Sequence, residues 1–243
     1  MTRAQGGATT GRLTLKLVLW DIDHTLIATR GVGGEIFGHC FELVTGQPMR
    51  EQAAVDGMTE PVIFRETAKL HGITGDRPMF EAFARFSAEQ HRLRAGELRE
   101  RGHALPGAGR VLAAVAALGH VEQTVVTGNI AAVAQTKLAV FGLDTHIRFP
   151  LGGYGEDHDE RAELVRTAIR RTSRSLNTLI DPQDVLLIGD TPADVKAALD
   201  NHVTVLAVAT GRSTTTELRD AGAGLVTADL EDPSPVLRAL TGR

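Results

Sequence analysis

Residues 15–26 read LKLVLWDIDHTL and pass from an apolar strand into a pair of acids. Leucines at positions 13, 15, 17 and 19 recur at every second residue, which indicates a β-strand, and the apolar second half predicts burial on both faces. Asp21 and Asp23 follow, and carboxylates two residues apart on an extended chain point the same way. Ligands of open α/β sheets bind at the carboxyl ends of the strands, so we expect this strand to deliver two acids to a site.

A simpler interpretation is that residues 21–25 form an acidic turn. In that case Asp and Thr side chains bond the local backbone, His24 fills a loop, and Thr25 caps the turn rather than placing a hydroxyl near a phosphate. This stretch alone does not separate the two interpretations, and the rest of the chain decides.

The bulk composition limits the kinds of partner. The chain has 243 residues, 42% of them hydrophobic, which is enough for one large domain or for a core plus a smaller one. A net charge of −4 and a pI near 6.1 do not favour nucleic acid. No apolar run approaches the roughly 20 residues of a membrane helix. We therefore expect a small-molecule partner, with no nucleic acid and no membrane.

The cysteine count and the first residues bear on the compartment. Cys40 is the only cysteine, which excludes an internal disulfide and fits a reducing compartment. The start of the chain lacks the apolar middle of a signal peptide. We expect residues 1–13 to be a disordered tail and the protein to be cytoplasmic.

Apolar residues recur at helical spacing between residues 31 and 105, where no convincing strand is found. We expect one helix after the glycines at 31, 33 and 34, which could form a hinge, a second opened by Pro61, and a third running to about residue 98. Six of the eight phenylalanines fall here, enough for a separate small core. We predict an all-helical cap over residues 31–105. The alternative is that these helices merely pack on the main sheet.

Strands and helices alternate after residue 106. Strands are expected at 121–127, 146–150, 184–189, 203–208 and 225–226, with helices between them. This order predicts an α/β fold, a Rossmann-like parallel sheet covered on both faces and built from residues 14–30 and 106–243. Thr191 and Pro192 predict the start of one helix, and Asp157 or Asp159 the cap of another.

Two further strand ends carry polar groups suited to a site. Thr127, Gly128 and Asn129 offer a hydroxyl and free backbone N–H groups, which suit a phosphoryl group. Lys137 lies about two helical turns later and is long enough to reach back to the strand ends. Taken alone, Lys137 would be a solvated helix lysine.

Asp190 and Asp194 stand at the end of the 184–189 strand and in the first turn of the next helix. Together with Asp21 and Asp23 they would gather four carboxylates, whose repulsion a divalent cation relieves. Oxygen ligands without Cys or His favour magnesium over zinc. Asp194 alone is equally explained as a negative charge at a helix N-terminus.

In order and spacing, the stretches at 21–26, 127–129 and 189–194, with Lys137 between the last two, resemble the four motifs of the haloacid dehalogenase (HAD) superfamily. The chain most resembles phosphoglycolate-phosphatase-like members, which carry a helical cap after the first motif. The resemblance extends from residue 15 to about residue 240. True dehalogenases generally lack the second acid of the first motif, so Asp23 favours a phosphatase.

The resemblance also implies roles for the site residues. Asp21 would be the nucleophile and form an aspartyl-phosphate, while Asp23 would act as general acid and base and place its main-chain carbonyl on the metal. Lys137 would neutralise charge on nucleophile and phosphate. The remaining roles are phosphoryl binding by Thr127, Gly128 and Asn129, and magnesium binding by Asp190 with support from Asp194.

The expected function is therefore a magnesium-dependent phosphatase that acts on a small phosphate monoester. A phosphosugar mutase of the same superfamily and a non-catalytic binding protein on this fold are the alternatives. Several other residues keep a plain interpretation: Cys40 as core, Arg161 as an exposed helix residue, Gly152, Gly153 and Gly155 as a turn that could border the site, and Arg50, Arg65 and Lys69 as surface or anion contacts. The sequence names neither the substrate nor the oligomeric state.

Overall fold

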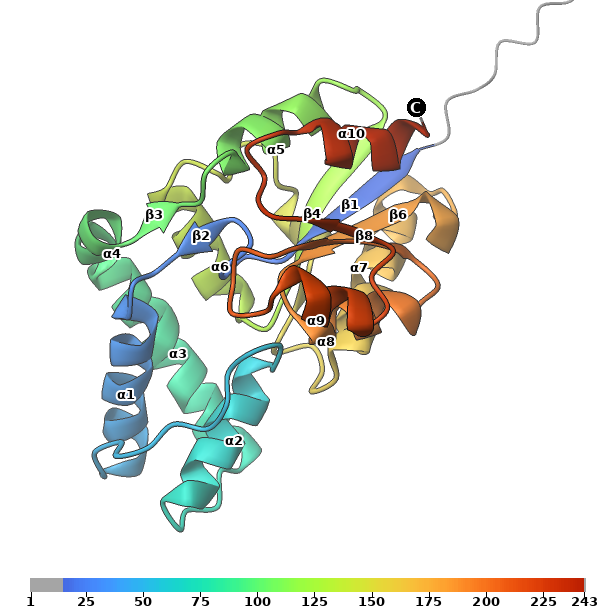
Figure 1. Ribbon diagram of the computed structural model, residues 1–243. Helices are drawn as coiled ribbons and strands as arrows, with labels where there is room; N and C mark the ends of the chain where they lie inside the picture. Colours follow the sequence, from blue (N-terminus) through green and yellow to red (C-terminus); the bar gives the residue numbers. More distant parts are fainter. Residues whose placement is uncertain (1–14, 243) are drawn as a thin grey trace, which may run out of the picture.

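The first strand, β1 (Lys16–Trp20), lies in the middle of a six-stranded sheet of order β5-β4-β1-β6-β7-β8, in which every neighbouring pair is parallel (Figure 1). The structure is a computed structural model that describes residues 15–242, so the tail expected over residues 1–13 lies outside the described residues. The predicted α/β class with a Rossmann-like parallel sheet is confirmed.

The alternation along β1 divides its side chains between the two faces of the sheet. Val18 and Trp20 belong to one apolar cluster, with residues of α5, α6 and α10, whereas Leu17 and Leu19 belong to another, with residues of α7, α8 and α9. Helices thus cover both faces, and the central strand is buried on each. The polar side chains at the strand ends lie outside these two apolar clusters.

The strands of this sheet are β1, β4 (Val121–Thr127), β5 (Gly153–Tyr154), β6 (Val185–Gly189), β7 (Thr204–Val208) and β8 (Leu225–Thr227). The helices that follow residue 105 are α5 (Ala108–Ala116), α6 (Ala131–Val140), α7 (Arg161–Leu176), α8 (Pro192–Leu199), α9 (Thr215–Asp220) and α10 (Ser234–Thr241), with short 3-10 turns η1 (Phe149–Leu151) and η2 (Pro182–Asp184).

The segment between β2 (Ile27–Ala28) and β3 (His103–Ala104) is helical. These two short strands pair antiparallel and frame α1 (Val32–Thr45), α2 (Glu60–Leu70), α3 (Arg77–Leu93) and α4 (Ala95–Arg101). In Figure 1 the four helices stand to one side of the sheet, beside the ends of its strands.

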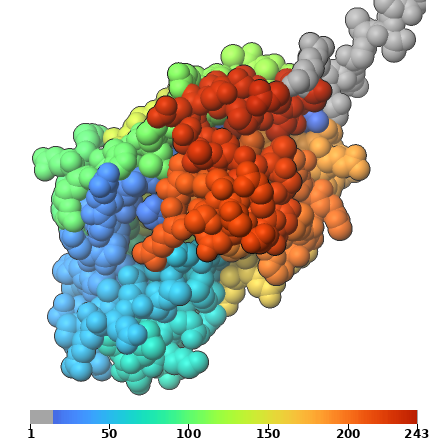
Figure 2. Space-filling model, in the orientation of Figure 1, coloured from blue at the N-terminus to red at the C-terminus, as the bar shows by residue number. Residues whose placement is uncertain are grey.

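The phenylalanines of these helices pack together, as in the pairs Phe37–Phe83 and Phe64–Phe83, whose ring centroids are 4.7 and 4.9 Å apart. Phe86 is the exception, being 43% exposed. The same apolar cluster includes Ile130 and Val133 from the start of α6. The helical segment is therefore joined to the sheet side by shared packing, and Figure 2 shows its blue and cyan surface lying directly against the orange C-terminal half.

Four local predictions were wrong. The strand expected at 146–150 is replaced by η1 and by β5 at residues 153–154, because Pro150 favours the first turn of a helix. The helix expected to run to residue 98 is two helices, separated at Arg94, and β3 lies within the segment expected to hold no strand. Gly33 and Gly34 lie in the first turn of α1 rather than in a hinge loop.

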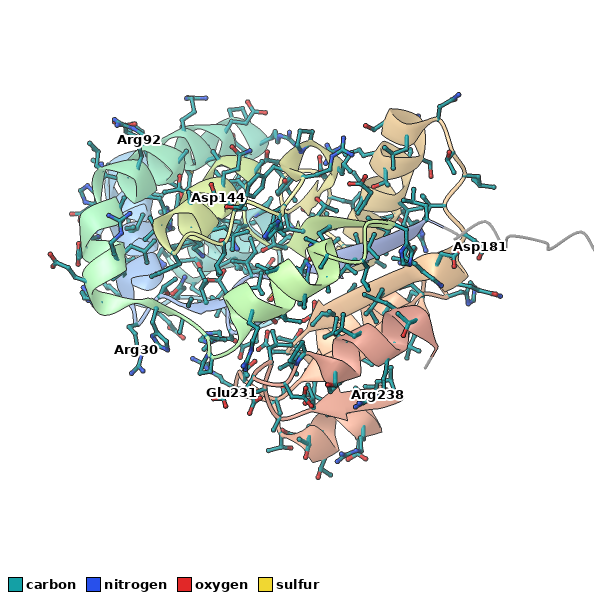
Figure 3. All side chains as sticks on the ribbon, turned by 90° about the horizontal axis from the view of Figure 1, so that it is seen from above. Arg30, Arg92, Asp144, Asp181, Glu231 and Arg238 are labelled. Atoms are coloured by element: carbon teal, nitrogen blue, oxygen red, sulfur yellow. The ribbon has the colours of Figure 1, made fainter. Side chains whose placement is uncertain are left out.

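Charged side chains of both signs are spread over the molecule, and Arg30, Arg92 and Glu231 lie at its outer edge in Figure 3. No helix within residues 15–242 has the length and apolar character needed to cross a membrane.

Candidate active site

Three neighbouring strands end at one edge of the sheet and carry polar groups there. Asp21 directly follows β1, Thr127 ends β4, and Asp190 directly follows β6. Because β4 and β6 flank β1 in parallel register, the three strand ends are adjacent. The sequence prediction that separate strand ends meet is thus confirmed for these residues.

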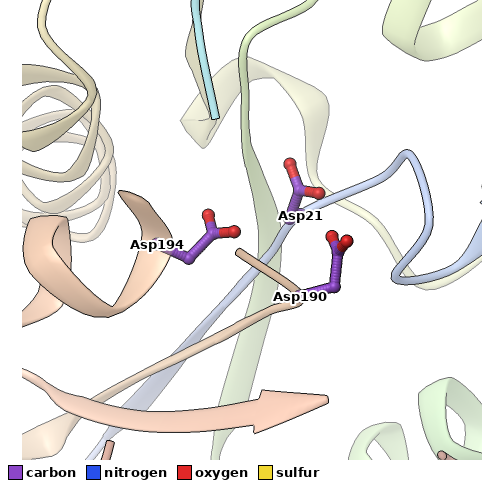
Figure 4. Close-up of side chains that lie close together, drawn as sticks. All are labelled: Asp21, Asp190 and Asp194. Carbon is purple, nitrogen blue, oxygen red and sulfur yellow. The ribbon is translucent and has the colours of Figure 1, made fainter. Parts of the chain in front are cut away.

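Asp21, Asp190 and Asp194 form a group of three buried carboxylates. One oxygen from each lies within 4.8 Å of the others, and Figure 4 shows the three carboxyl groups turned toward a common space. Burial, together with the charge of neighbouring acids, raises the pKa of Asp21 to about 7 and that of Asp190 to about 8. With all three acids ionised, the group would carry more negative charge than its surroundings balance.

Arg161 is the cation that the sequence interpretation missed. We expected an exposed helix residue, but Arg161 is buried because α7 packs beside α8 and places its first residue next to Asp194. Its Nη2 atom lies 2.5 Å from Oδ1 of Asp21, and its Nε atom lies 2.6 Å from Oδ1 of Asp194. The guanidinium thus bridges Asp21, which follows β1, and Asp194 of α8. Its planar arrangement of several N–H donors suits such a bridge.

Both carboxylate oxygens of Asp194 are hydrogen-bonded within the protein. Oδ1 accepts from Arg161, and Oδ2 accepts from the backbone N–H and the hydroxyl of Thr191, at 3.1 and 2.7 Å. Thr191 and Asp194 form a capping box at the start of α8, as the N-cap prediction for Thr191 required. Asp194 therefore orients Arg161 and caps the start of α8. As a member of the three-acid group, it would also lie beside a cation bound there.

Asp23 and Lys137 form a second ion pair, away from the three acids. The ammonium Nζ of Lys137 lies 2.9 and 2.7 Å from the two oxygens of Asp23 and 2.7 Å from Oδ1 of Asn129. Burial raises the pKa of Asp23, but the charge and hydrogen bonds of Lys137 outweigh it, so this pKa lies below its usual value. The structure places Lys137 against Asp23, whereas Arg161 contacts Asp21, and neutralisation of the nucleophile and phosphate by Lys137 stays a prediction.

The turn after β4 lies next to the Asp23–Lys137 ion pair. Nδ2 of Asn129 donates to Oδ2 of Asp23 and to Oγ1 of Thr127, at 2.7 and 2.8 Å. A side chain at Gly128 would place its Cβ 2.1 Å from the carbonyl oxygen of Met58, so glycine permits the helical segment to approach this turn. Thr127, Gly128 and Asn129 are therefore brought together beside Asp23, as the sequence predicted.

Thr25 and the loop that contains Gly211 lie close to the carboxylate of Asp190. The hydroxyl of Thr25 donates to Oδ1 of Asp190 at 3.1 Å, so Thr25 positions an acid rather than only capping the turn. A Cβ at Gly211 would lie 1.8 Å from Oδ2 of Asp190, which shows how closely the loop after β7 approaches. The glycine in that loop carries no signal in the sequence that distinguishes it from an ordinary turn residue.

The three-acid group has the chemistry of a divalent cation site. Its donors are all oxygens, its carboxylates are buried, and the single charge of Arg161 does not balance three acids. Asp23, which the sequence prediction included among the metal ligands, is outside the three-acid group.

A cavity of about 240 Å³ lies over these groups, walled by the strand-end residues on one side and by the helical segment on the other. The backbone N–H of Glu60 donates to the carbonyl of Gly128 at 2.8 Å, and the Glu60 carboxylate accepts from the N–H of Ile130 at 3.0 Å. These bonds hold α2 against the turn after β4. Arg50, Arg65 and Lys69, considered as anion contacts, do not line this cavity.

Comparisons with known proteins agree with this arrangement. The sequence profile of the haloacid dehalogenase-like hydrolase family matches residues 18–199. A comparison with curated protein sequences found no match.

Solved structures share the fold. A hydrolase from Pseudomonas syringae is 19% identical, covers 92% of this chain and 98% of its own, and has a TM-score of 0.66. A predicted phosphoglycolate phosphatase from Haemophilus somnus 129pt is 16% identical, with 92% and 98% covered and a TM-score of 0.64. A Bacteroides vulgatus protein provisionally named a β-phosphoglucomutase is 19% identical, with 96% and 91% covered and a TM-score of 0.64. At these identities the likeness establishes the fold.

Proposed function

The chain belongs to the haloacid dehalogenase-like hydrolase family, and we propose that it is a magnesium-dependent phosphatase that hydrolyses a small phosphate monoester through an aspartyl-phosphate on Asp21. The observation that carries this proposal is the position of Asp21. Its carboxylate lies at a cavity wall, next to Asp190 and Asp194 and bonded to Arg161. Two of the structural neighbours are named as a predicted phosphoglycolate phosphatase and, provisionally, as a β-phosphoglucomutase, and both names imply small phosphorylated substrates.

Asp21 and Asp190 would hold the cation through carboxylate oxygens, with the main-chain carbonyl of Asp23 as a further ligand and Asp194 behind them. Bound Mg²⁺ would supply positive charge that shields the phosphate from the carboxylates. The raised pKa values of Asp21 and Asp190 are in accord with a group that needs such a charge to stay ionised. All other tasks of the reaction fall to side chains of this protein.

The proposed reaction has two displacements at phosphorus. A carboxylate oxygen of Asp21 bonds to phosphorus, the ester P–O bond breaks, and a proton on Asp23 passes to the departing oxygen. Asp23 then takes a proton from water, whose oxygen bonds to phosphorus and releases Asp21 and inorganic phosphate. The contact with Lys137 holds Asp23 beside the path of both protons and favours its ionised form for the second step.

Several side chains of the site could donate hydrogen bonds to the phosphoryl oxygens. Arg161 is bonded to the nucleophile itself, so it would follow the charge from carboxylate to phosphate. The hydroxyl of Thr127 and the side-chain amide of Asn129 lie at the end of β4, next to Gly128. Positioned donors of this kind stabilise the spread negative charge of phosphoryl transfer.

The helical segment gives the reason to propose a small substrate. It closes one side of a cavity of about 240 Å³, in which an ester the size of a phosphorylated metabolite fits and a folded protein does not. A cavity covered in this way also limits water while the acyl phosphate exists.

The test is turnover of 4-nitrophenyl phosphate with Mg²⁺ by the wild type and by Asp21→Asn. The wild type should release phosphate, and Asp21→Asn should show none above background because an amide oxygen is a poor nucleophile. Asp220→Asn, on the exposed end of α9, is the matched control and should retain wild-type activity. Activity retained by Asp21→Asn would reject the assignment, and transfer of the phosphoryl group back to a sugar phosphate would favour the mutase.

A further inference from the structure

His91 lies on α3 and is one of the residues that line the active-site cavity. The residue is 4% exposed, and Nδ1 lies 2.8 Å from the carbonyl oxygen of Ser87, one helical turn earlier. A carbonyl oxygen only accepts hydrogen bonds, so Nδ1 carries the ring proton and donates it. Nε2 of the neutral ring is then an acceptor.

This acceptor has no hydrogen-bond donor in the part of the chain that the structure describes. Among residues 15–242, Nε2 of His91 is the only buried side-chain nitrogen or oxygen atom without a hydrogen-bond partner. Burial and the nearby charge of Lys137 lower the pKa of His91 to about 4, against smaller opposing effects from the Ser87 carbonyl and Asp23, so the ring is neutral in neutral solution. Buried polar atoms are almost always paired, and an exception in a residue that lines a binding cavity is a candidate contact for a ligand.

The charges around the cavity narrow the kind of ligand. Within the described chain, no lysine or arginine of residues 31–105 lines it, whereas Glu60 and Asp56, the latter paired with Arg212, do. The two lining cations are already bonded to acids, Lys137 to Asp23, and Arg161 to Asp21 and Asp194. A second anionic group on the substrate would therefore find acids and no free cation on the cap side of this cavity.

On the basis of the proposed phosphatase function, we infer that the alcohol released is uncharged and carries a second hydroxyl group that donates a hydrogen bond to Nε2 of His91. The substrate class is then the monophosphate of a small polyol or sugar. Phosphorylated hydroxy acids such as phosphoglycolate are disfavoured, because their carboxylate cannot donate to His91 and meets no cation. His91 is a binding residue in this account and takes no part in the bond changes.

Three esters that differ only at the far carbon test the inference. The kcat/KM for phosphate release with Mg²⁺ is measured for 2-hydroxyethyl phosphate, ethyl phosphate and phosphoglycolate, with 4-nitrophenyl phosphate as the general probe. We expect 2-hydroxyethyl phosphate to exceed each of the other two by about 10-fold, the size of effect that one well-placed hydrogen bond produces. Phosphoglycolate turned over as well as or better than 2-hydroxyethyl phosphate would overturn the inference.

Variants of His91 locate the preference in one atom. His91→Phe keeps a ring and removes the acceptor, so the preference for 2-hydroxyethyl over ethyl phosphate should vanish, mainly through KM. His91→Gln places an amide oxygen near the position of Nε2 and should retain part of it. His39→Phe, on the exposed side of α1 and outside the cavity, is the control.

The outcomes separate the inference from the function on which it rests. If 4-nitrophenyl phosphate is hydrolysed but His91→Phe keeps the wild-type preference, the role of His91 is wrong and the phosphatase stands. If no ester is hydrolysed by the wild type, both fall. Should His91→Phe not fold, as judged by circular dichroism, the ratios of the wild type and of His91→Gln decide.

Discussion

Replacing Arg161 by methionine should destabilise the fold and impair the chemistry together. The side chain is buried and bonds two buried carboxylates, so its loss leaves Asp21 and Asp194 without their cation. Breaking a buried ion pair from one side costs about 3–5 kcal/mol, more than the pair itself is worth, because the remaining charge stays desolvated. For turnover, loss of a positioned donor at the transferred group should lower kcat by about 10²–10³-fold.

Urea unfolding in the presence of a chelator measures the first effect, with Arg166→Met as control. Arg166 is on the same helix but is exposed and pairs with Glu163, so its replacement should cost less than about 1 kcal/mol. The loss in Arg161→Met should be larger near about pH 8 than near about pH 5, because Asp21, whose pKa is raised to about 7, takes up a proton as the pH falls. A loss no greater than that of Arg166→Met, with activity retained, would refute the ion-pair reasoning.

Three other perturbations address separate parts of the account. Asp23→Asn should lower kcat/KM for an alkyl phosphate by about 10²–10⁴-fold but less for 4-nitrophenyl phosphate, whose leaving group departs without a proton; equal losses would contradict the role of Asp23 as acid. Gly57→Ala should raise KM about 10-fold or more, because the added Cβ would lie 2.3 Å from Cβ of Ala193 and displace the loop over the site. Gly46→Ala shares the positive φ but meets nothing within 4 Å, and equal effects of the two would contradict the clash. His91 has a pKa of about 4 in the folded protein and 6.5 ordinarily, so the unfolded chain binds more protons at acid pH. The free energy of unfolding should therefore decrease as the pH is lowered below about 6.5, by about 2 kcal/mol at pH 5. Urea unfolding of His91→Phe should lack this part of the pH dependence, and an unchanged pH dependence would contradict the assignment.

The parts of the fold that follow a simple period could be predicted from the sequence. The alternating leucines before Asp21 specify a strand buried on both faces, and the observed division of Leu17 and Val18 between two clusters follows from that period. The adjacency of Asp21, Thr127 and Asp190 follows from parallel topology, which places the carboxyl ends of neighbouring strands at one edge.

Contacts set by helix packing could not be predicted in the same way. Arg161 is one of several arginines on α7, and nothing in its neighbours distinguishes it. Its burial results from the packing of α7 against α8 and from the start of the helix at that residue. The pairing of Lys137 with Asp23 rather than Asp21 depends on a side-chain direction that spacing along a helix does not fix.

The helical segment shows the same limit. Its supply of phenylalanines indicated a core of its own, yet the apolar cluster continues onto α6 through Ile130 and Val133. Hydrophobic spacing shows that a face is buried but does not identify the element that covers it. The unpaired Nε2 of His91 likewise could not be predicted. It results from the hydrogen bond between Nδ1 and the Ser87 carbonyl and from the lack of a donor near Nε2 among residues 15–242, and neither can be read from the sequence.

The central claim, that Asp21 receives the phosphoryl group, is tested most directly by trapping the intermediate. The wild type is mixed with Mg²⁺ and 4-nitrophenyl phosphate, quenched in acid during turnover, and treated with borohydride, which reduces an acyl phosphate to an alcohol. Peptide mass spectrometry should then find homoserine at position 21 and aspartate in unreacted enzyme. Unmodified aspartate at position 21 under conditions of rapid turnover, or homoserine at another aspartate, would contradict the account.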